Sequence, residues 1–110
     1  MILTVLDTET TGLDPDIHEI IQIAAITYVL DAEGNRYVMK KWEKKINPQQ
    51  LHTASEKALQ VNGFTIEEWV GSPNALEVLP EVKEIIEGSD VLLGQNLIFD
   101  LNFIHEICSR

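Results

Sequence analysis

The chain has 110 residues, of which 45% are hydrophobic and 24% charged, and its formal net charge is −10. This composition is typical of a globular domain and excludes a disordered or fibrous protein. No apolar run reaches the roughly 20 residues of a membrane span, Asp7 comes too early for a secretory signal, and the single Cys108 cannot form an internal disulfide. We therefore expect a cytoplasmic protein with no membrane partner.

The negative net charge by itself argues against a polyanionic partner such as nucleic acid, because affinity for phosphates comes largely from Lys and Arg. The basic residues are not spread evenly, however. Five of the eight fall in one short segment: Arg36, Lys40, Lys41, Lys44 and Lys45. Some of the acids can also bind cations rather than face water. The net charge therefore does not decide the class of partner.

The first half of the sequence predicts three strands. Residues 1–6 are almost wholly apolar, which indicates a buried central strand. Residues 20–30 form a longer apolar stretch rich in β-branched side chains, and residues 36–46 read as a third strand. The turn-forming sequence DAEGN, residues 31–35, separates the second strand from the third. We therefore expect these two strands to form a β-hairpin.

A first helix is predicted over residues 53–60, with Thr53 or Ser55 as its N-cap and Asn62 followed by glycine as its end. A second helical pattern follows and ends at Gly88. Its apolar residues recur at three- and four-residue spacing, which is the pattern of an amphipathic helix. These residues are Leu76, Leu79, Val82, Ile85 and Ile86, and Pro80 among them should mark a kink or a new first turn.

The last predicted elements are a short buried strand at residues 91–93 and a helix from Leu97 to about Cys108, with Asn96 as its N-cap. The predicted order is thus three strands, two helices, one strand and one helix. The sequence contains no internal repeat or linker, so we expect a single α/β domain.

The stretch LDTETTGLD, residues 6–14, places Asp7 and Glu9 two positions apart after the first predicted strand. Side chains alternate across an extended chain, so both carboxylates point to one side, with their Cα atoms roughly 6.5 to 7 Å apart. The following residues have turn chemistry, so the acids should lie at or just past the carboxyl end of a buried strand, where α/β sheets bind ligands. For this pair alone, a solvated turn is the favoured alternative.

A second motif, GQNLIFD at residues 94–100, favours a ligand site over a solvated turn. It places Asp100 on the first turn of the last helix. If the strand before it runs parallel to the first strand, Asp100 can face Asp7 and Glu9. Three carboxylates about 7 Å apart would repel one another by about 2.4 kcal/mol per pair at an effective dielectric constant of about 20. A divalent cation removes this penalty, and ligands that are all oxygen favour Mg²⁺ or Mn²⁺.

These motifs resemble those of a known family. The segments LDTETTGLD, HEIIQIAAI, INPQQ, ALQVNGFT and VLLGQNLIFDLNFI are similar to the first two motifs and connecting segments of DEDD-type 3′–5′ exonucleases. This RNase H-like family includes a proofreading epsilon subunit of a DNA polymerase, and the resemblance covers essentially the whole chain. It implies an RNase H-like mixed α/β sheet, with a three-stranded antiparallel meander, one parallel strand and flanking helices.

The resemblance also implies an activity. It is that of a metal-dependent 3′–5′ exonuclease, which releases nucleoside 5′-monophosphates from the 3′ end of DNA or RNA. Such an enzyme works beside a polymerase or another replication or repair partner. Asp7, Glu9 and Asp100 match three of the four acids that hold two Mg²⁺ or Mn²⁺ ions in such enzymes.

Four further residues match positions that the resemblance assigns to substrate binding. The backbone around Thr10 and Thr11 would touch the terminal nucleotide, and Leu13 would pack against its base. Asn96 would either contact the substrate or only cap the last helix, with equal support for each role. Phe99 is expected to anchor that helix in the core instead.

The third motif of the family, a His or Tyr base followed by a fourth acid, has no counterpart after Asp100. His18, His52 and His105 do not match it. We therefore expect residues 1–110 to be one exonuclease-like domain, truncated at its C-terminus and with at most traces of activity on its own. The alternative is a catalytically inactive module that binds nucleic acid or protein through a residual metal site. A third possibility is another phosphoryl reaction on the same fold.

Two surface features complete the sequence-based expectations. The truncated last helix would expose Leu101, Ile104 and Cys108 as an apolar patch, which predicts self-association. The third strand places lysines beside Tyr37 and Trp42, and such a strand could track a phosphate backbone. Lysines also protect an edge strand from aggregation, and we favour this second interpretation.

Overall fold

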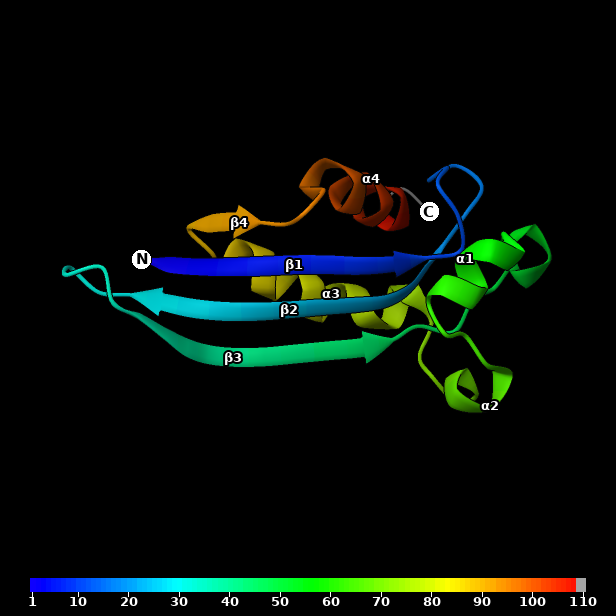
Figure 1. Ribbon diagram of the computed structural model, residues 1–110, viewed down its shortest axis with the longest axis horizontal. Helices are drawn as coiled ribbons and strands as arrows, with labels where there is room; N and C mark the ends of the chain where they lie inside the picture. Colours follow the sequence, from blue (N-terminus) through cyan, green and yellow to red (C-terminus); the bar gives the residue numbers. More distant parts are fainter. Residues whose placement is uncertain (109–110) are drawn as a thin grey trace.

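The computed structural model describes residues 1–108 and shows a mixed four-stranded sheet flanked by helices (Figure 1). The strand order is β3-β2-β1-β4; the first three strands are antiparallel neighbours, and β4 runs parallel to β1. This confirms the expected α/β class and sheet topology. The elements are β1 (Ile2–Thr10), β2 (Ile20–Leu30), β3 (Arg36–Lys45), η1 (Leu51–Thr53), α1 (Glu56–Val61), α2 (Ile66–Trp69), α3 (Ala75–Glu87), β4 (Val91–Leu93) and α4 (Leu97–Cys108).

Strand β1 is longer than its apolar run predicts, since it continues past Leu6 and through both acids to Thr10. The cause is the ladder to β2, in which Thr8 pairs with Ile23 beyond the end of the apolar run. Thr8 and Thr10 are buried and β-branched, and such residues fit a strand even though they are polar. The acids therefore lie at the carboxyl end of the strand, as one of the two expected positions, but within it and not past it.

Strands β2 and β3 form the expected hairpin, whose turn extends to one end of the molecule (Figure 1). β2 has the predicted bounds, and β3 ends one residue earlier than predicted. Gly34 in the connecting turn has a φ of 87°, a value that side chains with a Cβ rarely adopt. Among residues 1–108, β3 pairs with β2 alone, so it is an edge strand of the sheet.

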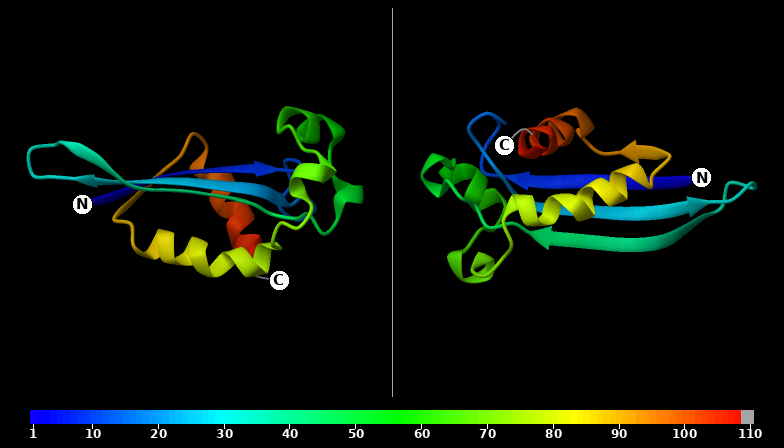
Figure 2. Two further views of the ribbon diagram at one scale, coloured as in Figure 1. Left: turned by 90° about the horizontal axis from the view of Figure 1, so that it is seen from below. Right: turned by 180° about the vertical axis from the view of Figure 1, so that it is seen from behind.

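Helices α3 and α4 cover one face of the sheet, and α1 lies toward the other face near the end of β1 (Figure 2). The core between the sheet and the helices is largely apolar, with a few buried polar side chains such as Thr4 and Thr27. Its buried apolar members are Leu6, Ile20, Ile23, Ala25, Ile46, Val78, Val82, Phe103, Ile104 and Ile107. Among the described residues, no helix has the length and apolar character needed to cross a bilayer.

The predicted apolar patch on the last helix is wrong for Ile104, which is only 6% exposed. α4 turns this side chain toward the core together with Phe103 and Ile107, so the burial comes from packing within the sheet and helix layers. Leu101 is half-buried and Cys108 is exposed. Ile98, on the first turn of α4, is the large apolar side chain that this helix leaves most exposed, at 75%.

Helix boundaries differ from the predictions in three places. α1 begins after Ser55, whose hydroxyl accepts the Ala58 N–H at 3.3 Å, whereas Thr53 belongs to the preceding 3₁₀ turn. α2 was not predicted, because four residues are too few to show a period. α3 continues through Pro80 without a break. Each difference involves one or two turns of helix and leaves the order of the predicted strands unchanged.

Candidate functional site

The two acids of β1 lie on the face of the sheet opposite the α3 and α4 core. Asp7 pairs with Ala24 of β2, and Glu9 pairs with Gln22. Leu6 and Thr8, which alternate with the acids along the strand, are buried on the helix side. Asp7 is exposed and Glu9 is half-buried. Both carboxylates therefore occupy one face of the sheet, where a ligand can reach them from solvent.

The third acid comes from the first turn of α4. Asp100 is only 4% exposed, and its Oδ1 accepts a hydrogen bond of 2.5 Å from the Thr8 hydroxyl. The chain reaches this position through Gly94, where a Cβ would lie 2.9 Å from the Leu6 carbonyl oxygen and 3.5 Å from Asp100 Oδ2. Because β4 pairs with β1 only as far as residue 5, the segment leading into α4 can cross close to the rest of β1.

The three acids interact electrostatically. Burial raises the pKa of Glu9 above its usual 4.5, and the charges of Asp7 and Asp100 raise it further. Burial also raises the pKa of Asp100 above its usual 3.8, with a further contribution from Asp7, while the hydrogen bond from Thr8 opposes the rise. The charge of Asp7 thus makes ionisation of both other acids harder, and the charge of Asp100 does the same to Glu9. Such mutual repulsion is what a bound cation would relieve.

The side chains do not, as they stand, surround one common point. Within residues 1–108, no three His, Cys, Asp or Glu side chains form a group that could hold a metal ion. One cause is visible in the hydrogen bonding: Asp100 is bonded to Thr8, which points to the face of β1 opposite Asp7 and Glu9. The carboxylates are electrostatically coupled, and their chemistry suits a hard cation such as Mg²⁺ or Mn²⁺. They are not a closed coordination shell.

The loop after β1 is held by its own backbone. Thr11 is fully buried; its N–H donates to the Glu19 carbonyl at 2.8 Å, and its carbonyl accepts the Ser55 N–H at 2.8 Å. The Thr10 carbonyl accepts a hydrogen bond of 2.8 Å from the Asn62 side-chain amide. These backbone groups, predicted to touch a substrate, thus already position the loop. A substrate would have to meet other atoms of the same segment.

The other two predicted substrate residues are accessible. Leu13, at the tip of the loop, is 82% exposed. Asn96 is exposed, and its carbonyl accepts the Asp100 N–H at 3.2 Å, which is the bond expected of an N-cap residue. This bond comes from the backbone, so it assigns no role to the exposed Asn96 side chain, and Leu13 has no core to pack against.

A pocket of about 590 Å³ opens beside Glu9, although neither Asp7 nor Asp100 lines it. It is lined by Glu9 and Thr10 from β1 and by Leu13 from the loop. Most of its other lining residues were not indicated by the sequence as site residues; among them are Lys57, Val61 and Asn62 at α1, and Phe99 from α4. Phe99 also packs against the core and against the Phe103 ring at a centroid distance of 4.9 Å, as expected of an anchor. No sequence signal placed α1 beside β1.

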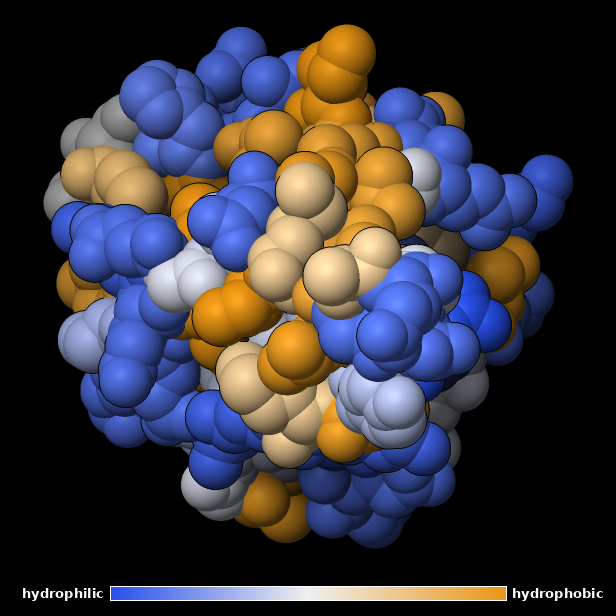
Figure 3. Space-filling model, turned by 90° about the vertical axis from the view of Figure 1, so that its left-hand side faces the viewer, coloured by the Kyte–Doolittle hydropathy of each residue, from blue (hydrophilic) through white to orange (hydrophobic). Residues whose placement is uncertain are grey.

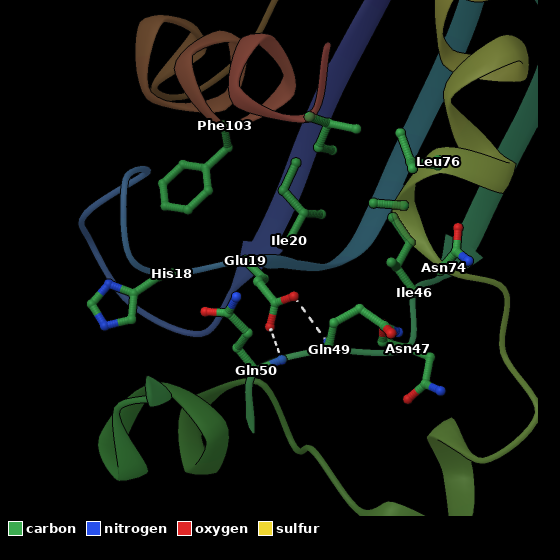
Figure 4. Close-up of a pocket in the computed structure, with 12 residues that line it drawn as sticks. His18, Glu19, Ile20, Ile46, Asn47, Gln49, Gln50, Asn74, Leu76 and Phe103 are labelled. Carbon is green, nitrogen blue, oxygen red and sulfur yellow. Dashed lines mark hydrogen bonds between the residues drawn. The ribbon is translucent and has the colours of Figure 1, made fainter. Parts of the chain in front are cut away.

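A smaller pocket of about 290 Å³ lies at the same end of the sheet (Figure 4). It is mostly apolar, with Phe103 on one side, and it contains the buried carboxylate of Glu19. That carboxylate accepts the backbone N–H groups of Gln49 and Gln50, both at 2.9 Å, as the dashed lines show. Glu19 thus joins the start of β2 to the segment after β3. Because both its oxygens are already bonded, we assign it a structural role.

Comparison with known proteins agrees with the motifs. A family model described as an exonuclease, RNase_T, matches residues 4–110. The chain belongs to this exonuclease family. It is 34% identical over 100 residues to the PolC-type DNA polymerase III of Thermotoga maritima and 33% identical to that of Staphylococcus aureus strain bovine RF122. These matches cover 91% of the chain but only 7% and 6% of the two polymerases.

Solved structures show the same fold. The chain superposes on E. coli Exonuclease I in complex with a dT13 oligonucleotide with a TM-score of 0.80, at 22% identity over 98% of the chain and 23% of the other protein. A product-bound structure of exonuclease I gives the same score and identity and is covered to 25%. These likenesses confirm the RNase H-like fold expected from the resemblance. The chain therefore spans a small part of each of these relatives.

Proposed function

We infer that this chain carries the first part of a 3′–5′ exonuclease site that acts on nucleic-acid ends with a divalent metal ion. The observation that carries this proposal is the electrostatic coupling of Asp7 and Asp100 to Glu9, which itself lines a pocket of about 590 Å³. Family membership supports hydrolysis of nucleic acid. The direction of digestion, the metal and the release of nucleoside 5′-monophosphates are part of the proposal.

In this proposal Asp7, Glu9 and Asp100 would hold Mg²⁺ or Mn²⁺. Bound there, the metal would neutralise the carboxylates and the scissile phosphate and make water more acidic. The terminal nucleoside would enter the pocket, where Leu13 and Phe99 offer apolar surface to its base. Thr10 and Thr11 would act by holding the loop that carries Leu13. Asn96 lies at the start of the helix that supplies Asp100 and would reach the substrate only from that end.

The test compares the chain on single-stranded oligonucleotides labelled at the 3′ end or at the 5′ end. We expect slow release of 3′-terminal mononucleotides with Mn²⁺ or Mg²⁺ and none with EDTA. Asp7→Asn and Asp100→Asn should each remove this activity, whereas Glu67→Gln, on the exposed surface of α2, should not. Release from the 5′ end, internal cleavage, or cleavage that survives EDTA would contradict the proposal.

A second candidate function is a binding module without catalysis. The observation in its favour is that the described acids do not form a group ready to hold a metal ion. Under this alternative the chain binds oligonucleotides or a protein partner, and metal changes that binding without release of nucleotides. Equilibrium binding of a 3′-labelled oligonucleotide, with no label released at high protein concentration and with Mn²⁺ present, would favour this alternative over the exonuclease.

A further inference from the structure

The free edge of the sheet carries an unusual concentration of positive charge. β3 holds five of the eight basic residues of a chain whose net charge is −10. Glu43 is the single acid in this strand. Most of the strand is exposed, and no strand in the described part of the chain covers its outer edge. Figure 1 shows it as the lowest strand of the sheet, away from β1 and α4.

The cations lie on both faces of the sheet. Lys40 and Lys44 pair with Thr27 and Ile23, which are buried on the helix side. Lys41 pairs with Ile26 and so lies on the opposite face, the face that also carries Asp7 and Glu9. Arg36 shares this second face, where its guanidinium lies 5.5 Å from the centre of the Tyr28 ring.

This two-sided distribution distinguishes between possible occupants. A nucleic acid that lies across the sheet can reach the cations of one face only. A strand added to the edge of β3 lies in the plane of the sheet, and its side chains alternate between the two faces. It can therefore meet Lys41 on one face and Lys40 and Lys44 on the other. Its backbone would also bond to the unpaired outer edge of β3.

Charge further limits which strand can bind. If a second copy of the chain paired through β3, it would bring together two strands that each carry five basic residues and one acid, and like charges across a strand pair destabilise it. An acidic strand would place carboxylates there instead. The basic residues thus disfavour pairing with a second copy of this chain and favour a partner of the opposite sign, beyond the protective role expected for edge lysines.

Apolar contacts are available beside the charged part. Tyr37, Val38 and Met39 at the start of β3 are 58%, 53% and 55% exposed. Figure 3 views the end of the molecule that carries the β2–β3 turn and shows apolar and hydrophilic residues side by side on that surface. We propose that β3 is a docking edge for an acidic, extended segment of a partner protein, which adds to the sheet as a fifth strand with apolar residues near Val38.

The probe is a synthetic fluorescent peptide in which Glu alternates with Val or Thr over eight residues, measured by fluorescence anisotropy. We expect saturable binding and loss of amide hydrogen exchange in residues 36–45. A peptide of equal charge with two central prolines should not bind, because proline lacks the N–H that pairs with the edge. Equal binding by the proline peptide would overturn the proposal, since it would show attraction without strand pairing.

The matched variants remove two charges each. Lys41→Gln with Lys44→Gln should weaken peptide binding roughly fivefold to tenfold, as expected for two cross-strand ion pairs. Lys57→Gln with Lys83→Gln, in α1 and α3, should leave it within twofold. If the β3 variant is poorly folded, hydrogen exchange of the unmodified chain still tests the proposal. Peptide binding without added protection of residues 36–45 would then overturn it. Displacement of the peptide by dT12, without added protection of residues 36–45, would assign the edge to nucleic acid and overturn the proposal.

Discussion

Thr8 and Asp100 are joined by a buried hydrogen bond of 2.5 Å, which connects the central strand to the last helix across 92 residues of sequence. Thr8 stands between Asp7 and Glu9 in β1 but points to the opposite face of the sheet. The carboxylate of α4 is thus fixed from behind the strand that carries the other two acids. The position and the charge of Asp100 therefore both depend on a residue that would not itself bind metal.

Replacement of Thr8 by Val should destabilise the protein by about 1.5 to 3 kcal/mol at neutral pH, because a buried carboxylate loses its hydrogen-bond donor. The loss should shrink at acidic pH, where Asp100 is protonated and no longer depends on that donor. Urea denaturation at two pH values measures both effects. Thr8→Ser keeps the hydroxyl and is the control. Equal destabilisation by the Val variant at both pH values would show that packing, and not the hydrogen bond, is lost.

The stability of the metal-free protein should depend on the protonation of two acids. The pKa values of Glu9 and Asp100 are raised in the folded state above 4.5 and 3.8, so the folded chain binds more protons than the unfolded chain just above these values. The free energy of unfolding should therefore fall as pH rises through this window. Denaturation in EDTA between pH 4 and pH 7 measures the slope.

The same experiment has an internal control. Glu9→Gln with Asp100→Asn removes both titrating groups, so the contribution of these acids to the slope should disappear. Mg²⁺ added to the unmodified chain at pH 7 should raise its stability, and added to the double variant it should not. A slope that persists unchanged in the double variant would assign the pH dependence to other groups.

Much of the fold could be predicted because its signals are local. β2 and β4 have the bounds read from their apolar runs, and the turn at Gly34 follows from turn-forming residues. The end of β1 was missed because Thr8 and Thr10 gain their strand conformation from pairing with β2, which a count of apolar residues does not register.

The candidate site was harder to predict from the sequence than the fold. Its motifs mark Asp7, Glu9 and Asp100, but nothing local indicates that α1 supplies Lys57 and Val61 to the neighbouring pocket.

Glu19 should matter for stability and not for binding of a substrate. Its carboxylate accepts two backbone N–H groups in a buried position, so Glu19→Ala leaves both without that acceptor. We expect a loss of about 2 to 4 kcal/mol in the free energy of unfolding. Chemical denaturation measures it, with Glu67→Ala on exposed α2 as the matched control. A change below 1 kcal/mol would show that water replaces the carboxylate at little cost.

Gly94 should be required for the approach of α4 to β1. A Cβ at this position would lie 2.9 Å from the Leu6 carbonyl oxygen, a backbone atom that cannot move without displacing the strand. Gly94→Ala should therefore cost about 1 to 3 kcal/mol and shift Asp100 away from Thr8. Gly71→Ala, which adds a Cβ in open space but at a φ of 82°, separates backbone strain from collision. Because Gly94 itself has no positive φ, a Gly94→Ala variant as stable as the unmodified chain would show that the added Cβ meets no costly collision.

Replacement of Leu13 should affect oligonucleotide binding without affecting the free energy of unfolding. The side chain is 82% exposed, and yet it lines the pocket beside Glu9. Leu13→Ala should leave the free energy of unfolding within about 0.5 kcal/mol. If a terminal base packs on this side chain, oligonucleotide binding should weaken about tenfold, roughly 1.4 kcal/mol. Val70→Ala removes a similarly exposed apolar side chain, at 73%, that does not line this pocket, and should change neither quantity. Unchanged binding in Leu13→Ala would place the nucleotide elsewhere, since no other effect of this exposed residue could compensate for the lost contact.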